Sequence, residues 1–169
     1  MSDLGPMNYF LRMEIYQSSA GIFISQRKYA MDILKKFKLE ACKEVVTPLA
    51  QNEKLSKNDG ERLDDPTTYR SLVGSLLYLT ATRPDLMFYA SLLSRFMSSP
   101  SSVHIGVAKR VLKFLKGTVA NGISYKRGEK IKLTGFFDSD WAGSVDDLKS
   151  TSGYVFMLGS GAIYWNSKK

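Results

Sequence analysis

The first part of the chain contains apolar runs that are rich in aromatic and β-branched side chains. Two such runs, residues 8–16 and 21–25, flank a small polar segment at 17–20, which is typical of two strands joined by a turn. From Gln26 the apolar period lengthens to that of a helix, which we expect to end near Leu39. The pattern therefore predicts a β-hairpin followed by an amphipathic helix.

The middle of the chain predicts three more helices after a polar interruption. Residues 47–67 contain Pro, Gly, Asn and Asp with few apolar side chains, so this segment is either a linker or a long surface loop. After it, apolar residues recur at helical spacing over 69–80, 85–97 and 103–116, with helix breakers between them. Three such stripes can pack together as one small bundle.

Beyond Gly117 the apolar period returns to two. Four short runs lie between turns rich in Gly, Ser and Lys, at 123–125, 131–138, 153–158 and 162–165. We predict an antiparallel meander of about four strands at this end. The whole chain then has an α+β fold: a hairpin and helix, a three-helix bundle, and a C-terminal sheet.

Composition narrows the class of protein without identifying it. The chain has 169 residues, 44% of them hydrophobic, which is enough for a real core in one domain or two small ones. A net charge of +8 favours an anionic partner such as nucleic acid. Cys42 is the single cysteine, which excludes an intrachain disulfide and suits an intracellular setting. No signal peptide or membrane-spanning run is evident, so we expect no membrane partner.

Two carboxylates close the apolar run at 131–138. Asp138 and Asp140 are two residues apart, so on a regular strand they share a face. Paired carboxylates suit Mg²⁺ or Mn²⁺, which prefer oxygen ligands and can activate water. The alternative is a polar strand end at the surface, and two carboxylates are too few for a two-metal site.

The sole histidine gives no sign of catalysis. His104 lies near the start of a predicted helix, and no Ser or Cys nucleophile motif accompanies it. We expect it to be an exposed or partly packed helix residue. The glycines are scattered, so no phosphate-binding loop is predicted either.

Basic and aromatic residues offer a second kind of site. Cations gather on the predicted helices at Arg27, Lys28, Lys35, Lys36, Lys109, Arg110, Lys113 and Lys116. These faces could follow a nucleic-acid backbone, or they could be solvated helix surfaces. Aromatic side chains of the hairpin, such as Tyr9 and Phe10, could stack on bases or belong to the core.

Several motifs, taken in order, resemble one known family. They are residues 3–11 (DLGPMNYFL), 21–30 (GIFISQRKYA), 69–80 (YRSLVGSLLYLT), 82–85 (TRPD), 109–118 (KRVLKFLKGT), 138–143 (DSDWAG) and 149–154 (KSTSGY). Together they resemble the Pol polyprotein of copia-type long-terminal-repeat retrotransposons, across the C-terminal part of reverse transcriptase and the start of RNase H. The resemblance covers nearly the whole chain.

The resemblance implies a division of the chain. Residues 1–46 would be the end of the reverse transcriptase palm with the first thumb-like helix, and 47–67 a linker. Residues 68–118 would be the helical thumb or connection-like region, and 119–169 a truncated RNase H-like sheet. It also implies a primer grip at Phe10, Leu11, Arg12 and Met13, although Arg12 stands where the family usually has Gly. The basic helices would hold an RNA–DNA or DNA template–primer duplex.

Asp138 matches the first RNase H carboxylate of the family, a ligand of Mg²⁺ in the ancestral enzyme. The family's polymerase aspartates and its later RNase H acids have no counterpart in this sequence, so we expect no catalysis and no tightly bound metal in the chain alone. The main hypothesis is a reverse transcriptase and RNase H fragment. The alternative is a retained, non-catalytic nucleic-acid-binding module.

The predicted C-terminal sheet raises a question of stability. An apolar face made by residues such as Phe137, Tyr154, Phe156 and Trp165 would be left exposed. We expect this region to be the least stable part of the chain or to self-associate.

Overall fold

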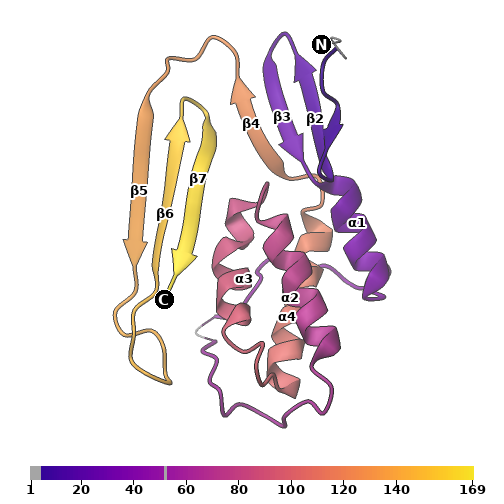
Figure 1. The fold of residues 1–169 in the computed structure, drawn as a ribbon, viewed down its shortest axis with the longest axis vertical. Helices are drawn as coiled ribbons and strands as arrows, with labels where there is room; N and C mark the ends of the chain where they lie inside the picture. The colour runs from indigo at the N-terminus through magenta and orange to yellow at the C-terminus, as the bar shows by residue number, and fades with distance from the viewer. Residues whose placement is uncertain (1–4, 52) are drawn as a thin grey trace.

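The computed structural model describes residues 5–51 and 53–169, and within them the fold is α+β, as predicted. A helical bundle lies at the centre and bottom of Figure 1. One antiparallel sheet lies above the bundle and a second lies along its side.

The helices agree with the apolar periodicity. Their bounds are Arg27–Lys36 for α1, Thr67–Leu79 for α2, Met87–Ser94 for α3 and Ser102–Gly117 for α4. The predicted helix at 85–97 begins as a single 3₁₀ turn, η1, at Pro84–Leu86. Proline suits this first turn because it lacks a backbone N–H that would have no partner there.

The buried core lies among the four helices. Its members are side chains of α1 to α4 and of the segments between them, including Ile33, Leu72, Leu76, Leu93 and Leu112. Burying a leucine side chain contributes about 1.5–3 kcal/mol. Tyr69 is fully buried as well, and its hydroxyl donates to the carbonyl of Leu93 at 2.8 Å.

The N-terminal sheet has the order β1-β2-β3-β4. Its strands are Tyr9–Phe10, Met13–Ser18, Gly21–Ser25 and Gly122–Lys126. The run at 8–16 was predicted as one strand, and this is wrong. It divides into β1 and β2 at a two-residue turn, where Leu11 and Arg12 have left-handed φ angles of 46° and 60°.

The prediction of a four-stranded C-terminal meander is also wrong. Its first expected strand is β4, which pairs with β3 of the hairpin, from Gly21 opposite Lys126 to Ser25 opposite Gly122. The two strands approach so closely that a Cβ on Gly122 would lie 2.2 Å from the carbonyl oxygen of Ile24. Local alternation predicts a strand here but cannot say which strand it joins.

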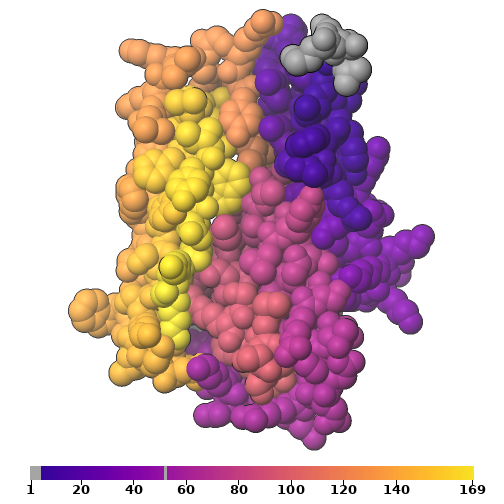
Figure 2. Space-filling view, viewed as in Figure 1, coloured from indigo at the N-terminus to yellow at the C-terminus, as the bar shows by residue number. Residues whose placement is uncertain are grey.

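The C-terminal sheet contains β5 (Leu133–Ser139), β6 (Ser152–Leu158) and β7 (Gly161–Lys168), in that order. One face is turned toward η1 and α3, and the Trp165 indole N–H of β7 donates to the Thr80 carbonyl at 2.9 Å. Trp165 was predicted on the exposed face, and this is wrong, because strand register places it on the opposite face from Tyr154 and Phe156. Figure 2 shows β7, in yellow, lying against the helices.

The described part of 47–67 is a long surface loop held against the bundle. The backbone N–H of Leu63 donates to Pro100 O at 2.9 Å, and that of Ser102 donates to Glu61 O at 2.8 Å. Leu55 inserts its side chain into the core. These contacts attach the loop to the start of α4.

Candidate nucleic-acid interface and carboxylate site

The turn between β1 and β2 places the predicted primer-grip residues at an exposed tip. The side chains of Phe10 and Leu11 are 50% and 61% exposed, and Met13 is half-buried. Tyr78 of α2 fixes the tip, because its hydroxyl donates to the Leu11 carbonyl at 2.6 Å. The tip therefore presents apolar side chains to solvent from a held backbone.

Cations from α1 and from the turn lie beside this tip. The Arg12 guanidinium is 5.1 Å from the centre of the Tyr29 ring, and the Lys28 ammonium is 5.5 Å from the centre of the Tyr9 ring. Arg27 is exposed next to Lys28. We call Phe10, Leu11, Arg12, Arg27 and Lys28 the hairpin–α1 surface.

A shallow depression of about 420 Å³ adjoins that surface, and Arg12, Tyr29, Lys36 and Tyr78 are among its lining residues. Sequence reasoning missed the parts played by Tyr29 and Tyr78. Their contacts join elements far apart in the chain. An aromatic residue outside the buried stripe of α2, such as Tyr78, is the one local signal that could have drawn attention to them.

The predicted cations of α4 have different surroundings. Arg110 donates to the Thr47 hydroxyl at 3.1 Å, and the Lys116 ammonium donates to the Cys42 carbonyl. Lys109 is exposed and Lys113 is half-buried. Two of the four cations of this helix therefore donate hydrogen bonds to the loop after α1.

Asp138 lies near the end of β5, where it accepts a hydrogen bond from the backbone N–H of Ser139 at 2.8 Å. It is exposed, and it lines a groove of about 740 Å³ between the sheet and α3. Apolar residues such as Met87, Phe88 and Trp165 form much of the groove wall.

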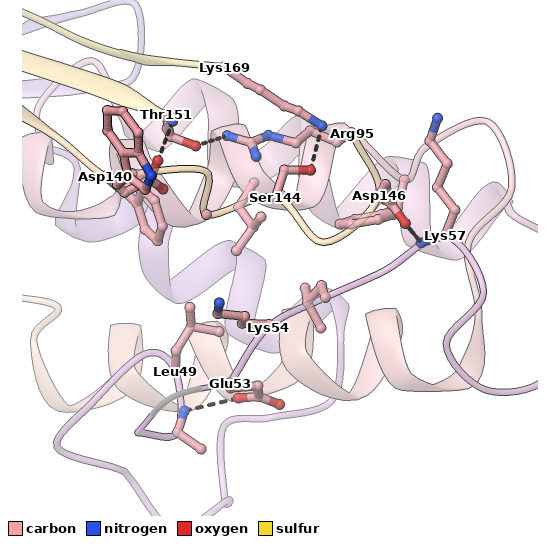
Figure 3. Close-up of a pocket in the computed structure, with 17 residues that line it drawn as sticks. Leu49, Glu53, Lys54, Lys57, Arg95, Asp140, Ser144, Asp146, Thr151 and Lys169 are labelled. Atoms are coloured by element: carbon pink, nitrogen blue, oxygen red, sulfur yellow. Dashed lines mark hydrogen bonds between the residues drawn. The ribbon is translucent and has the colours of Figure 1, made fainter. Parts of the chain in front are cut away.

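Asp140 has a structural role. Its carboxylate accepts the backbone N–H of Thr151 at 2.6 Å, and Arg95 donates to the Thr151 hydroxyl at 2.9 Å (Figure 3). Burial lowers the pKa of Arg95, and the charges of Asp140 and Asp147 act in the opposite direction. These contacts hold the β5–β6 loop against α3.

The other acids of that loop are also engaged. Asp146 accepts the Ser56 hydroxyl at 2.7 Å, and this bond lowers the pKa of Asp146. The Lys169 ammonium lies 2.6 Å from the Asp147 carboxylate, and its hydrogen bond lowers the pKa of Asp147 to about 2. Figure 3 shows Asp146 and Lys169 around a pocket of about 450 Å³.

The donor set does not fit a tightly held Mg²⁺. Within residues 5–51 and 53–169, no three His, Cys, Asp or Glu side chains gather as a metal site. The Asp140 carboxylate accepts a hydrogen bond from Thr151, so Asp138 is the exposed carboxylate at the end of β5 that could serve as a metal ligand. A hard cation that prefers six or so oxygen ligands would be held weakly by one carboxylate.

The expectation that His104 is exposed or partly packed is wrong. It is fully buried and stacks on Phe96 with ring centres 4.0 Å apart. Nδ1 accepts the backbone N–H of Ser101 at 3.0 Å, so Nε2 carries the proton and donates to Ser56 O at 3.0 Å. Burial lowers the pKa of His104. The residue caps α4 and anchors the 47–67 loop.

None of the helices in the described part of the chain combines the length and the hydropathy that a membrane crossing needs.

Comparison with known proteins identifies the family. Over its full length the chain is 43% identical to the retrovirus-related Pol polyprotein from transposon RE1 of Arabidopsis thaliana, and it covers 12% of that protein. It is 44% identical over 96% of its length to the corresponding polyprotein from transposon RE2, of which it covers 11%. The chain belongs to the copia-type retrotransposon Pol polyproteins.

A shorter protein is similar over the same 169 residues. An uncharacterized mitochondrial protein of Arabidopsis thaliana is 38% identical over the whole chain, which covers 70% of it. No family model and no solved structure matches the chain. The prediction that the chain belongs to the copia-type Pol family is thus confirmed. The chain spans about an eighth of the length of the transposon polyproteins.

Proposed function

We propose that this chain is the junction of reverse transcriptase and RNase H in a copia-type Pol polyprotein, and that it holds the template–primer duplex through the hairpin–α1 surface. One observation carries the proposal. The structure brings the exposed apolar tip at Phe10 and Leu11 together with the cations of Arg12 and Lys28.

This combination suits an RNA–DNA or DNA duplex. Cations neutralise phosphates and release counterions, which gives affinity that falls as salt rises. An apolar tip can pack on sugars or on the terminal base pair, where an aromatic ring also stacks. The +8 net charge of the chain favours the encounter.

Asp138 fits the first carboxylate of the ancestral RNase H site, where Mg²⁺ would activate the attacking water. Because the donor set here does not fit that ion, we derive no cleavage step for the chain, and we propose that it binds nucleic acid without cutting it. Mg²⁺-dependent cleavage of an RNA–DNA hybrid that is lost in Asp138→Asn would contradict this.

The test is fluorescence anisotropy with labelled RNA–DNA and DNA duplexes over a range of salt. Arg27→Glu with Lys28→Glu should weaken binding at least about tenfold and flatten the salt dependence, since each phosphate contact adds to its slope. Lys130→Glu with Lys132→Glu, which makes the same change in net charge at two exposed sites in the β4–β5 connection, is the control for non-specific charge. Equal binding by the control and the Arg27 and Lys28 pair would overturn the proposal.

The alternative binding module uses the basic face of α4. The exposure of Lys109 favours it, whereas the internal contacts of Arg110 and Lys116 count against it. If Lys109→Glu with Lys113→Glu weakens duplex binding and the Arg27 and Lys28 pair does not, α4 is the binding face.

A further inference from the structure

The second sheet carries an aromatic cluster on the face opposite that of Trp165. Strand register places Phe137 opposite Tyr154, and Phe156 opposite Tyr164, on the same face. Each of the three strands contributes at least one ring. Phe137 is 71% exposed and Tyr164 is 59% exposed.

The rings contact one another but do not form a closed core. Phe137 meets Phe156 edge-on at 5.4 Å, and Tyr154 meets Tyr164 at 5.4 Å with the ring planes 39° apart. The contacts hold the rings in place, while the exposed fractions leave room for a flat ligand to stack on them. We call Phe137, Tyr154, Phe156 and Tyr164 the aromatic face.

Polar groups border this face, and the one charged side chain among them is a lysine. Register continues the face to Asn166, opposite Tyr154, and to Lys168, opposite Ser152. Lys168 is exposed and forms no ion pair with any described residue. None of the strand residues on this side of the sheet is acidic, because Asp138 falls on the other face, opposite Gly153.

We propose that the aromatic face binds single-stranded nucleic acid by stacking bases on Phe137, Tyr154, Phe156 and Tyr164. An antiparallel sheet with exposed aromatic rings is an established way to stack two or three bases, and every base offers a π-face. Lys168, together with the absence of carboxylates among the strand residues of this face, suits the negative charge of a nucleic acid. If a second copy of this basic chain covered the face instead, two Lys168 side chains would be brought into one apolar contact, where their like charges are unfavourable.

The aromatic face adjoins the hairpin–α1 surface. A groove of about 350 Å³ has both Tyr78 and Tyr164 in its wall, and Tyr78 holds the Leu11 carbonyl at the hairpin tip. A strand that leaves a duplex at the tip has a path to the sheet along this groove. The binding of a single strand at the sheet does not itself require the duplex site.

The experiment measures anisotropy of a short labelled oligothymidylate with the full chain at low and moderate salt. Phe137→Leu with Tyr164→Leu keeps apolar side chains and removes the rings, and we expect affinity to fall at least about tenfold. Trp141→Ala removes an aromatic side chain that is 96% exposed but lies outside the sheet, and it should bind as the wild type does. Circular dichroism melts check that the variants fold.

Three results would overturn the inference. The first is that the wild type does not bind the oligothymidylate. The second is that the double leucine variant binds it with unchanged affinity. The third is a wild-type dimer in sedimentation that the leucine variant does not form, because a second copy would then be the occupant of the aromatic face. The Arg27→Glu and Lys28→Glu pair separates the two proposals, because it should weaken duplex binding and leave the oligothymidylate bound.

Discussion

At the scale of single residues, two side chains occupy environments that their sequence neighbourhood does not reveal. Arg12 has a φ of 60° in the β1–β2 turn, a conformation that costs a residue with a Cβ about 1–2 kcal/mol. The cation–π contact with Tyr29 offsets part of this, by roughly 0.5–1 kcal/mol at an exposed site.

Arg12→Gly and Arg12→Ala separate these two effects, because both lose the contact with Tyr29 and only glycine relieves the backbone. We expect the glycine variant to be more stable than the alanine variant by about 1 kcal/mol. Chemical denaturation at equilibrium measures the difference. Equal stability would mean that the turn relaxes without strain.

His104 makes stability depend on pH. Its folded-state pKa is below the ordinary value of 6.5 because burial disfavours the charged ring. The unfolded chain therefore binds more protons, so stability is full above pH 6.5 and is lost as the pH falls through the lowered pKa.

Denaturation midpoints measured between pH 7.5 and 5.5 should show this loss. His104 is the single histidine, so few other groups titrate there. His104→Gln should be less stable at pH 7.5 and nearly independent of pH over that range. A wild-type midpoint that stays constant would contradict a neutral, buried ring.

At the scale of elements, the pairing of β4 with β3 depends on Gly122. Gly122→Ala should separate β4 from β3, because its methyl group would meet the Ile24 backbone, and we expect a loss of about 1–3 kcal/mol. Gly106→Ala is the matched control. It lies in α4 with open space around it, so it should stabilise by about 0.5–1 kcal/mol. Thermal melts of the two variants should shift in opposite directions.

The helices could be predicted from sequence, since apolar residues at helical spacing depend on nothing distant. The partners of the strands could not. Nothing local distinguishes 123–125 from the later strands, and the turn at Leu11 and Arg12 lacks the Asn-Gly pair that usually marks it. Asp138 could be singled out from its position at the end of an apolar run, whereas the hydrogen bond that Asp140 accepts comes from Thr151, on the other side of the loop.

At the scale of the whole molecule, stability should be uneven. The buried core draws its residues from the helices and the loops between them, and none of its described members comes from β5, β6 or β7. Native-state hydrogen exchange should therefore show the slowest amides in α2 and α4 and faster exchange in β6. Slowest exchange in β6 of a monomer would contradict this.

The pairing of β4 with β3 also constrains the order of folding. The helical bundle lies between these strands in sequence, so the first sheet cannot close until all four helices have been synthesised. Until then β3 keeps an unpaired edge, which is a template for strands of other molecules. A chain that ended at Gly117 would keep this edge open permanently, whereas one that ended at Lys126 would close it. Loss of the second sheet is therefore the milder truncation, and loss of β4 is the one that should cause aggregation.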